Sequence, residues 1–118
     1  MPPKKQTQPD LNTLAAVADY FKVLSETSRL QILHHLRSSP MNVMELCEAT
    51  GLGQANISKH LKVLTQAGIL SRQPKGTGAY YEIIDPAIFE FCDLACDRIH
   101  DRILKQTKAL KQLKQLQR

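Results

Sequence analysis

Two groups of side chains in this 118-residue sequence have types and spacings that could do chemistry. The first lies in residues 51–81, a window with four basic side chains and no Asp or Glu. Fixed cations attract the phosphates of nucleic acids, whereas carboxylates repel them. Four charges could cluster by chance, but their arrangement favours a nucleic-acid site. The four are Lys59, Lys62, Arg72 and Lys75.

The second group is the three cysteines, Cys47, Cys92 and Cys96. Cys92 and Cys96 are one helical turn apart, so their thiolates could chelate a thiophilic ion such as arsenite or antimonite. A disulfide within one helix is geometrically poor, which favours co-ligands over a redox pair at these two positions. Alternatively, Cys47 could pair with a cysteine of the last helix, or the cysteines could be small core residues.

Charge and composition limit the class of protein. The formal charge is +5, but residues 1–9 and 105–118 hold seven of the 16 basic side chains and no acid. Residues 10–104 therefore carry nine basic against 11 acidic side chains, and the basic window stands out in a mildly acidic body. We expect no membrane span and no secretory signal, and an odd number of cysteines fits a reducing cytoplasm.

Apolar spacing predicts a mostly helical chain before residue 68. Asp10 is expected to cap a first helix, and residues 25–28 provide a break and the next cap. Asn42 and Glu45 are spaced as a capping box that opens a short third helix. Gly51–Gly53 is then a tight connection to a helix from about Gln54 to Ala67, which is the helix-turn-helix pattern.

This fourth helix is expected to read DNA, because one face is apolar and the other carries small, amide and basic side chains. Amides pair well with adenine edges, and cations anchor phosphates. His60 lies at the edge of the apolar face, where it could pack or contact phosphate. The predicted DNA-binding residues, with those of the hairpin that follows, are Gln54, Ala55, Asn56, Ser58, Lys59, His60, Lys62, Arg72, Lys75 and Gly76.

A wing and a long last helix complete the predicted fold. Gly68 should end the reading helix in a left-handed conformation, and residues 69–73 and 79–84 read as strands joined by a loop over 74–78. Asp85 and Pro86 favour a helix start, and its long apolar stripe suggests a dimer seam with the first helix. We therefore predict a mainly α winged helix-turn-helix with a two-stranded wing, a homodimer through its first and last helices.

Several segments, in order, resemble the ArsR/SmtB family of winged-helix repressors between about Leu14 and Arg102. They are Phe21–Leu33, Glu45–Cys47, Ile57–Leu64, Ala67–Leu70 and Gly78–Tyr81. The resemblance implies a dimeric repressor that releases its operator when an effector arrives. A two-fold dimer would favour an inverted-repeat operator.

The resemblance also bears on the effector. The family's third-helix metal site needs a second thiolate two residues after the first, but Ala49 stands there. At the positions of the family's zinc site in the last helix stand Asp85, Ala87, Arg98 and Asp101, so zinc is disfavoured. Arsenite or antimonite on cysteines is the first expectation. Oxidation or persulfide uptake through Cys47 and a last-helix cysteine, as in some family members, is the alternative.

The predicted organisation has three parts. Residues 1–9 are a disordered basic tail, residues 10–104 bind DNA and dimerise, and residues 105–118 are a basic helical extension rich in Lys, Gln and Leu. No Gly-rich phosphate loop, paired-His metal helix or nucleophile elbow is present, so we expect no enzyme and no obligatory cofactor. The rival of another class is a small helical protein-interaction module.

Overall fold

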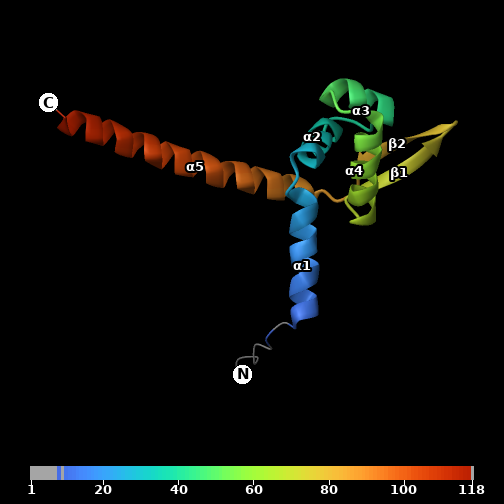
Figure 1. Ribbon diagram of the computed structural model, residues 1–118, viewed down its shortest axis with the longest axis horizontal. Coiled ribbons are helices and arrows are strands. Elements are labelled where there is room, and N and C mark those ends of the chain that lie inside the picture. Colours follow the sequence, from blue (N-terminus) through green and yellow to red (C-terminus); the bar gives the residue numbers. More distant parts are fainter. Residues whose placement is uncertain (1–7, 9, 118) are drawn as a thin grey trace. The chain divides into compact units, whose positions relative to one another are not determined.

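The computed structural model describes residue 8 and residues 10–117, which form two compact units (Figure 1). One unit ends at Ile84 and the other begins at Asp85. The predicted disordered tail, residues 1–9, lies outside the described residues apart from Gln8.

The first unit begins with two capped helices. α1 spans Leu11–Leu24, and the Asp10 carboxylate accepts a hydrogen bond of 2.7 Å from the backbone N–H of Thr13. That bond stabilises the charged carboxylate and lowers the pKa of Asp10. α2 spans Thr27–Leu36, and its cap is Glu26, which accepts from the backbone N–H of Arg29.

The predicted helix-turn-helix follows. α3 spans Val43–Thr50 and opens with the predicted capping box between Asn42 and Glu45. Gly51 ends α3 with a φ of 76°, a left-handed conformation that glycine adopts without strain. α4 spans Gln54–Gln66, and the Gly68 that follows it has a φ of 79°, as predicted.

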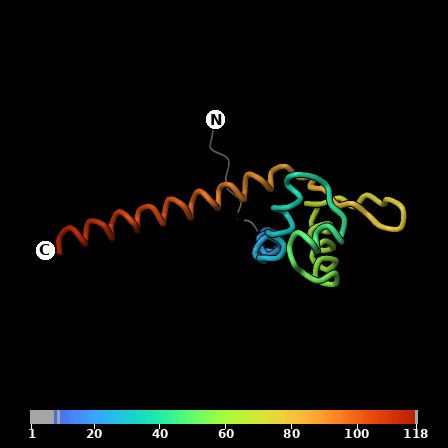
Figure 2. Tube along the Cα trace, turned by 90° about the horizontal axis from the view of Figure 1, so that it is seen from above, coloured from blue at the N-terminus to red at the C-terminus, as the bar shows by residue number. Residues whose placement is uncertain are grey.

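The wing is an antiparallel hairpin of β1, Leu70–Lys75, and β2, Gly78–Ile83 (Figure 2). The predicted loop over residues 74–78 is wrong, because both strands run further and leave a two-residue turn. Proline lacks a backbone N–H but is tolerated in an edge strand, and both strands of a two-stranded sheet are edges. Pro74 therefore pairs with Ala79.

The core of this unit joins α2, α3, α4 and the hairpin, whereas α1 contributes no buried residue. Its members are apolar side chains that the interior shields from water, and one histidine of α4 accompanies them. They are Ile32, Leu33, Leu36, Leu46, Ile57, Leu61, Leu64, Ile69, Leu70 and Ala79, with His60.

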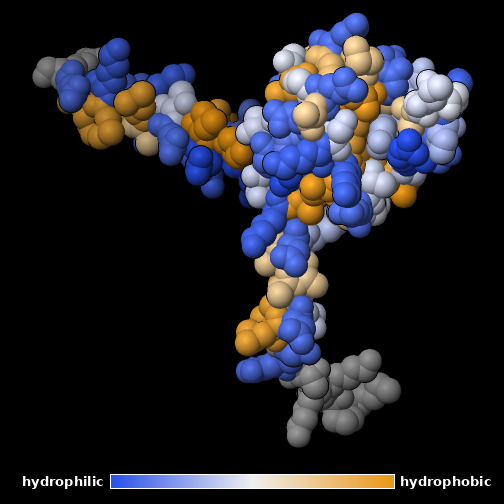
Figure 3. Space-filling view, turned by 45° about the vertical axis from the view of Figure 1, so that its right-hand side comes forward, coloured by the Kyte–Doolittle hydropathy of each residue, from blue (hydrophilic) through white to orange (hydrophobic). Residues whose placement is uncertain are grey.

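The second unit is one long helix, α5, which spans Ala87–Leu116. The Asp85 carboxylate accepts a hydrogen bond from the backbone N–H of Ala87, so the predicted start is correct to within one residue. Among the residues of α5 that the structure describes, Ile88 alone is buried. Exposed apolar side chains follow along the helix, as they do along α1 (Figure 3). None of the described helices combines the length and apolar character needed to span a bilayer.

Candidate nucleic-acid interface

Helix α4 has two chemically distinct faces. Ile57, Leu61 and Leu64 are fully buried and hold the helix against the rest of its unit. The opposite face is exposed and carries no carboxylate, because α4 contains no Asp or Glu. It presents the predicted residues Gln54, Ala55, Asn56, Ser58, Lys59 and Lys62 to solvent.

The start of α4 is also open. Its N-cap is Gly53, and no side chain accepts a hydrogen bond from the first turn. The first backbone N–H groups of a helix have no partner inside the helix and carry partial positive charge. An anion such as a DNA phosphate can therefore bind there, beside the exposed side chains of Gln54 and Asn56.

A groove of about 280 Å³ separates α4 from one face of the hairpin. Ser58 and Lys62 of α4 and Arg72 of β1 line it, so three predicted site residues from two elements meet there. Thr65, Gln66 and Tyr81 complete the lining, and Tyr81 pairs directly with Arg72 across the hairpin. A hydroxyl, an ammonium and a guanidinium around an open groove match the donors that bind a phosphate backbone.

The two basic residues of the hairpin lie on different faces. Arg72 lines the groove beside α4, whereas Lys75 lines a second groove with Gln73, Tyr80 and Glu82. Side chains alternate between the two faces of a strand, and Arg72 and Lys75 are an odd number of residues apart. The Lys75 ammonium lies 5.2 Å from the centroid of the Tyr80 ring, a cation–π contact at the tip of the wing.

The tip itself is a tight turn with an exposed backbone. Gly76 has a φ of 63°, which a side chain would strain, and it follows Lys75 directly. The predicted contacts Lys75 and Gly76 therefore lie at the tip, away from the groove that holds Lys62 and Arg72.

His60 does not belong to this surface. Its side chain is 7% exposed. Its ring nitrogens face Glu26, the N-cap of α2, and Arg29 in the first turn of α2. The ring packs against the start of α2, which favours the packing role that the sequence leaves open beside a phosphate contact. A histidine on an apolar helix face was the available sign of burial.

The cysteines lie in different units. Cys47 on α3 and Cys92 on α5 are half-buried, Cys96 is exposed, and none of the three thiols is in a disulfide. Among the described residues, no three His, Cys, Asp or Glu side chains converge as metal ligands would. On α5, Cys92 and Cys96 are one helical turn apart and so can be adjacent thiols.

The positions considered for zinc already have protein partners. Asp85 accepts from the backbone N–H of Ala87, and the Arg98 guanidinium donates to the Asp101 carboxylate at 2.6 Å. His100 lies 3.7 Å from the other oxygen of Asp101. A cation at one ligand position and an ion pair at another do not fit a zinc site.

Sequence reasoning did not include Tyr81, Thr65 and Gln66 among the groove residues. The sequence places Tyr81 in the wing but not in the groove, because its position opposite Arg72 depends on the hairpin register. Thr65 and Gln66 lie one turn beyond Lys62, and that spacing on α4 was the signal that could have found them.

Comparisons with known proteins identify relatives of this chain. Residues 26–72 match the family described as bacterial regulatory protein, arsR family. The chain is 34% identical over 86 residues to the HTH-type transcriptional regulator NmtR of Mycobacterium tuberculosis, covering 73% of this chain and 72% of that protein. It is 33% identical over 69 residues to the arsenical resistance operon repressor of Bacillus subtilis, covering 58% and 66%.

Solved structures have the same fold. The AntR antimony-specific transcriptional repressor superimposes with a TM-score of 0.70 and 27% identity, over 88% of this chain and 96% of that one. A homodimeric winged helix-turn-helix domain from Mycobacterium bovis superimposes with a TM-score of 0.69 and 27% identity, over 87% and 94%. The predicted winged helix-turn-helix is confirmed, and these relatives regulate transcription rather than catalyse reactions. The chain belongs to the arsR family of bacterial regulatory proteins.

Proposed function

We propose that this chain is a homodimeric repressor that binds an inverted-repeat operator and releases it when a thiophilic effector reaches its cysteines. Residues 10–104 would bind DNA and dimerise, residues 105–118 would be a basic helical extension, and the protein would act in the cytoplasm on double-stranded DNA. The main observation behind this proposal is the groove between α4 and the hairpin. Ser58, Lys62 and Arg72 line this groove, and no carboxylate does.

The exposed face of α4 suits the major groove of DNA. Gln54, Asn56, Ser58 and Lys59 offer amide, hydroxyl and ammonium groups to base edges or to the phosphates beside them. Lys62 and Arg72 would hold the phosphate backbone in the groove, and Lys75 and Gly76 would meet it at the wing tip. In a two-fold dimer the two α4 helices would enter successive major grooves about 34 Å apart.

Dimerisation is supported by the apolar side chains that the single chain leaves exposed. Leu14 and Phe21 of α1 are about half exposed, and so are Ile99 and Ile103 of α5. Contiguous exposed apolar side chains of this kind mark interaction surfaces. A homodimer through α1 and α5 would cover them.

The effector proposal rests on the cysteines and on the relatives. The two thiols of α5, Cys92 and Cys96, suit arsenite or antimonite, and a third sulfur or a donor from a second copy would complete a three-coordinate site. Similarity to an arsenical resistance repressor and to an antimony-specific repressor agrees with that ion class. The second candidate is a thiol switch in which peroxide or polysulfide, itself reduced to water or sulfide, takes two electrons from Cys47 and Cys92 or Cys96 as they form a disulfide; α3 and α5 each carry a half-buried thiol.

Substitution Lys59→Glu tests the DNA-binding proposal. The charge reversal places a carboxylate on the exposed face of α4, and we expect it to abolish operator binding in a gel shift while the dimer stays intact by sedimentation. Lys22→Glu, the same charge change on α1, is the matched control and should keep binding. Wild-type affinity in Lys59→Glu would refute the interface.

The effector proposal is tested on the reduced protein bound to operator DNA. Arsenite, antimonite, zinc, peroxide and polysulfide are titrated separately against wild type, Cys47→Ser and Cys92→Ser/Cys96→Ser. Release by arsenite that survives Cys47→Ser but not the double variant supports the α5 thiols. Release by peroxide or polysulfide that needs Cys47 supports the thiol switch, and release that survives the loss of all three thiols contradicts both.

A further inference from the structure

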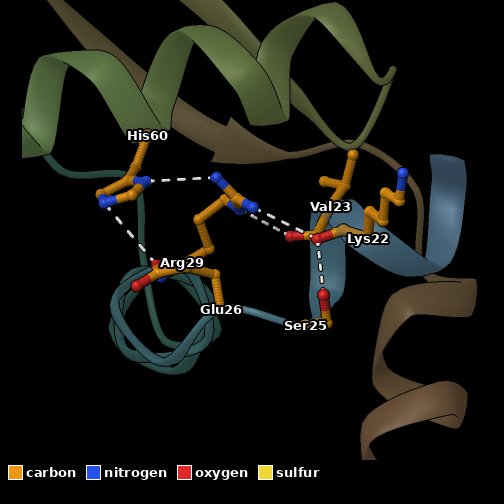
Figure 4. Close-up of polar contacts among 6 residues, drawn as sticks. All are labelled: Lys22, Val23, Ser25, Glu26, Arg29 and His60. Carbon is orange, nitrogen blue, oxygen red and sulfur yellow. Dashed lines mark hydrogen bonds and ion pairs between the residues drawn. The ribbon is translucent and has the colours of Figure 1, made fainter.

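The buried side of α4 carries one titratable group, and both of its nitrogens face the beginning of α2. Nδ1 of His60 lies 3.4 Å from Nη1 of Arg29, and Nε2 lies 3.6 Å from Oε2 of Glu26 (Figure 4). The other buried residues of α4 are apolar. His60 is therefore the place where the back of α4 makes directional contacts.

The chemistry of arginine sets the polarity of this contact. A guanidinium only donates hydrogen bonds, so Nδ1 of a neutral His60 must accept from Arg29. The ring proton then resides on Nε2, which faces the Glu26 carboxylate. Glu26 is itself held, because its Oε2 accepts from the backbone N–H of Arg29 at 3.0 Å.

The same guanidinium also holds the end of α1. Its Nε donates to the carbonyl oxygen of Val23 at 2.7 Å, and Nη2 donates to that of Lys22 at 3.2 Å. These carbonyls belong to the last turn of α1, and that of Lys22 also accepts from the backbone N–H and the hydroxyl of Ser25. Arg29 thus connects three helices, since it lies on α2 and its side chain contacts α1 and α4.

Directional contacts matter here because apolar contacts leave a helix some freedom to rotate. The hydrophobic effect has no preferred direction. A rotation of α4 by about 20° would move groups on its outer surface, roughly 6 Å from the axis, by about 2 Å. That displacement exceeds the tolerance of a hydrogen bond to a base edge.

We propose that Arg29 is a positioning residue for DNA reading: through His60 it fixes the rotation of α4 that presents Asn56, Ser58 and Lys59. The inference rests on the proposed DNA-binding function. It adds Arg29, a residue outside the interface, to the residues on which that function depends. Arg29 acts on sequence specificity, while Lys62 and Arg72 supply the affinity that does not depend on sequence.

The test compares specific with non-specific binding. The specific probe is a duplex that wild-type protein selects from a random library, and the other is a scrambled duplex of equal length. The variants are Arg29→Lys, which keeps the charge but cannot bridge several acceptors, and His60→Leu, which removes the acceptor. His60→Gln, which keeps an acceptor and a donor, is the conservative variant, and Arg98→Lys at an exposed arginine is the control.

We expect Arg29→Lys and His60→Leu to lower the ratio of specific to non-specific affinity by about tenfold or more, with non-specific affinity nearly unchanged. His60→Gln and Arg98→Lys should retain most of the ratio. Measurements are made where circular dichroism shows each variant folded. In the double variant, Arg29→Lys should lower the affinity ratio little beyond the effect of His60→Leu, because each substitution already removes the contact between Arg29 and His60.

Several results would overturn the inference. One is an unchanged ratio in folded Arg29→Lys and His60→Leu, and another is an equal fall of both affinities, which would indicate a purely structural role. If the variants do not fold, nitrogen NMR of wild-type His60 decides, because a proton on Nδ1 contradicts the contact. If wild type selects no sequence at all, the proposed function fails rather than this inference.

Discussion

Helices α4 and α5 differ in how much of their apolar surface their own chain covers. α4 has 13 residues and buries four of them, whereas α5 has 30 residues and buries Ile88 alone among those described. Ile57 of α4 is fully buried, while Ile99 of α5 is 52% exposed. In the proposed dimer, the chain by itself would fix the helix that reads DNA, and a second copy would cover the apolar side of α5.

The two helices also differ in charge. α4 carries two lysines and no acid, whereas α5 mixes acids and bases up to Arg102 and is purely basic from Lys105 onward. A carboxylate-free surface beside a groove that holds Arg72 is suited to phosphate. For this reason we propose DNA contact for α4, whose own face carries no acid, before α5.

The largest effect should come from the same truncation made in both helices. Ile57→Ala opens a cavity in the core, and we expect it to lower the free energy of unfolding by about 2–5 kcal/mol. Ile99→Ala should cost under about 1 kcal/mol in dilute protein and more as concentration rises. Chemical denaturation at two protein concentrations measures the free energy of unfolding of both variants. If both lost the same free energy at both concentrations, α4 and α5 would not differ in how their own chain covers them.

The next effect concerns the dimer. Ile99→Asp/Ile103→Asp places charges on the apolar side of α5, and we expect the dimer dissociation constant to rise by at least about tenfold. Sedimentation measures this, with helical content as the check on folding. Arg98→Asp, at an exposed position of the same helix, is the comparison variant. If the dimer dissociation constant did not change in Ile99→Asp/Ile103→Asp, the dimer interface would lie elsewhere.

A smaller effect should separate the lysines of the two helices. Lys62→Gln removes a phosphate contact, so the slope of log affinity against log salt should fall by about one for each protomer. Lys108→Gln in α5 should leave the slope unchanged. Fluorescence anisotropy over a salt series measures both, and equal losses would mean that α5 also binds the phosphate backbone.

The smallest effect should come from the different starts of the helices. Asp85 already accepts a hydrogen bond near the start of α5, whereas Gly53 leaves α4 without a side-chain cap. A Cβ on Gly53 would meet nothing within 4 Å, so Gly53→Ser should stabilise the protein by a few tenths of a kcal/mol.

Gly53→Asp should cap the helix equally well and yet weaken DNA binding, because its carboxylate would repel phosphate. Thermal melts and gel shifts on the two variants measure the opposite signs. If Gly53→Asp bound DNA as tightly as wild type, the start of α4 would lie away from the phosphates.

Local chemistry was enough to predict most of the fold. Asn42 and Glu45 predict the capping box, and Gly68 predicts the left-handed end of α4. Each of these features depends only on residues close by in the sequence. The wing loop is shorter than the sequence predicts, because Pro74 pairs with Ala79 at an edge of the sheet, and that position depends on strand pairing. The same pairing decides that Arg72 faces α4 and Lys75 does not.

The candidate site was predictable in part for the same reason. Helical spacing separates the exposed Ser58, Lys59 and Lys62 from the buried Ile57. The contact between Arg29 and His60 joins residues 31 positions apart, and no periodicity in the sequence reports such a pair. Only the packing of α2 against α4 brings them together.

Arg29 holds α1 by two backbone carbonyls, those of Lys22 and Val23, and not by their side chains. Every residue type supplies a carbonyl, so the side chains of α1 are free to diverge without loss of this anchor. Related copies of the gene could acquire different α1 surfaces, and hence different pairing preferences, while each keeps its reading helix aligned. Partner choice and sequence recognition can therefore evolve separately within one small chain.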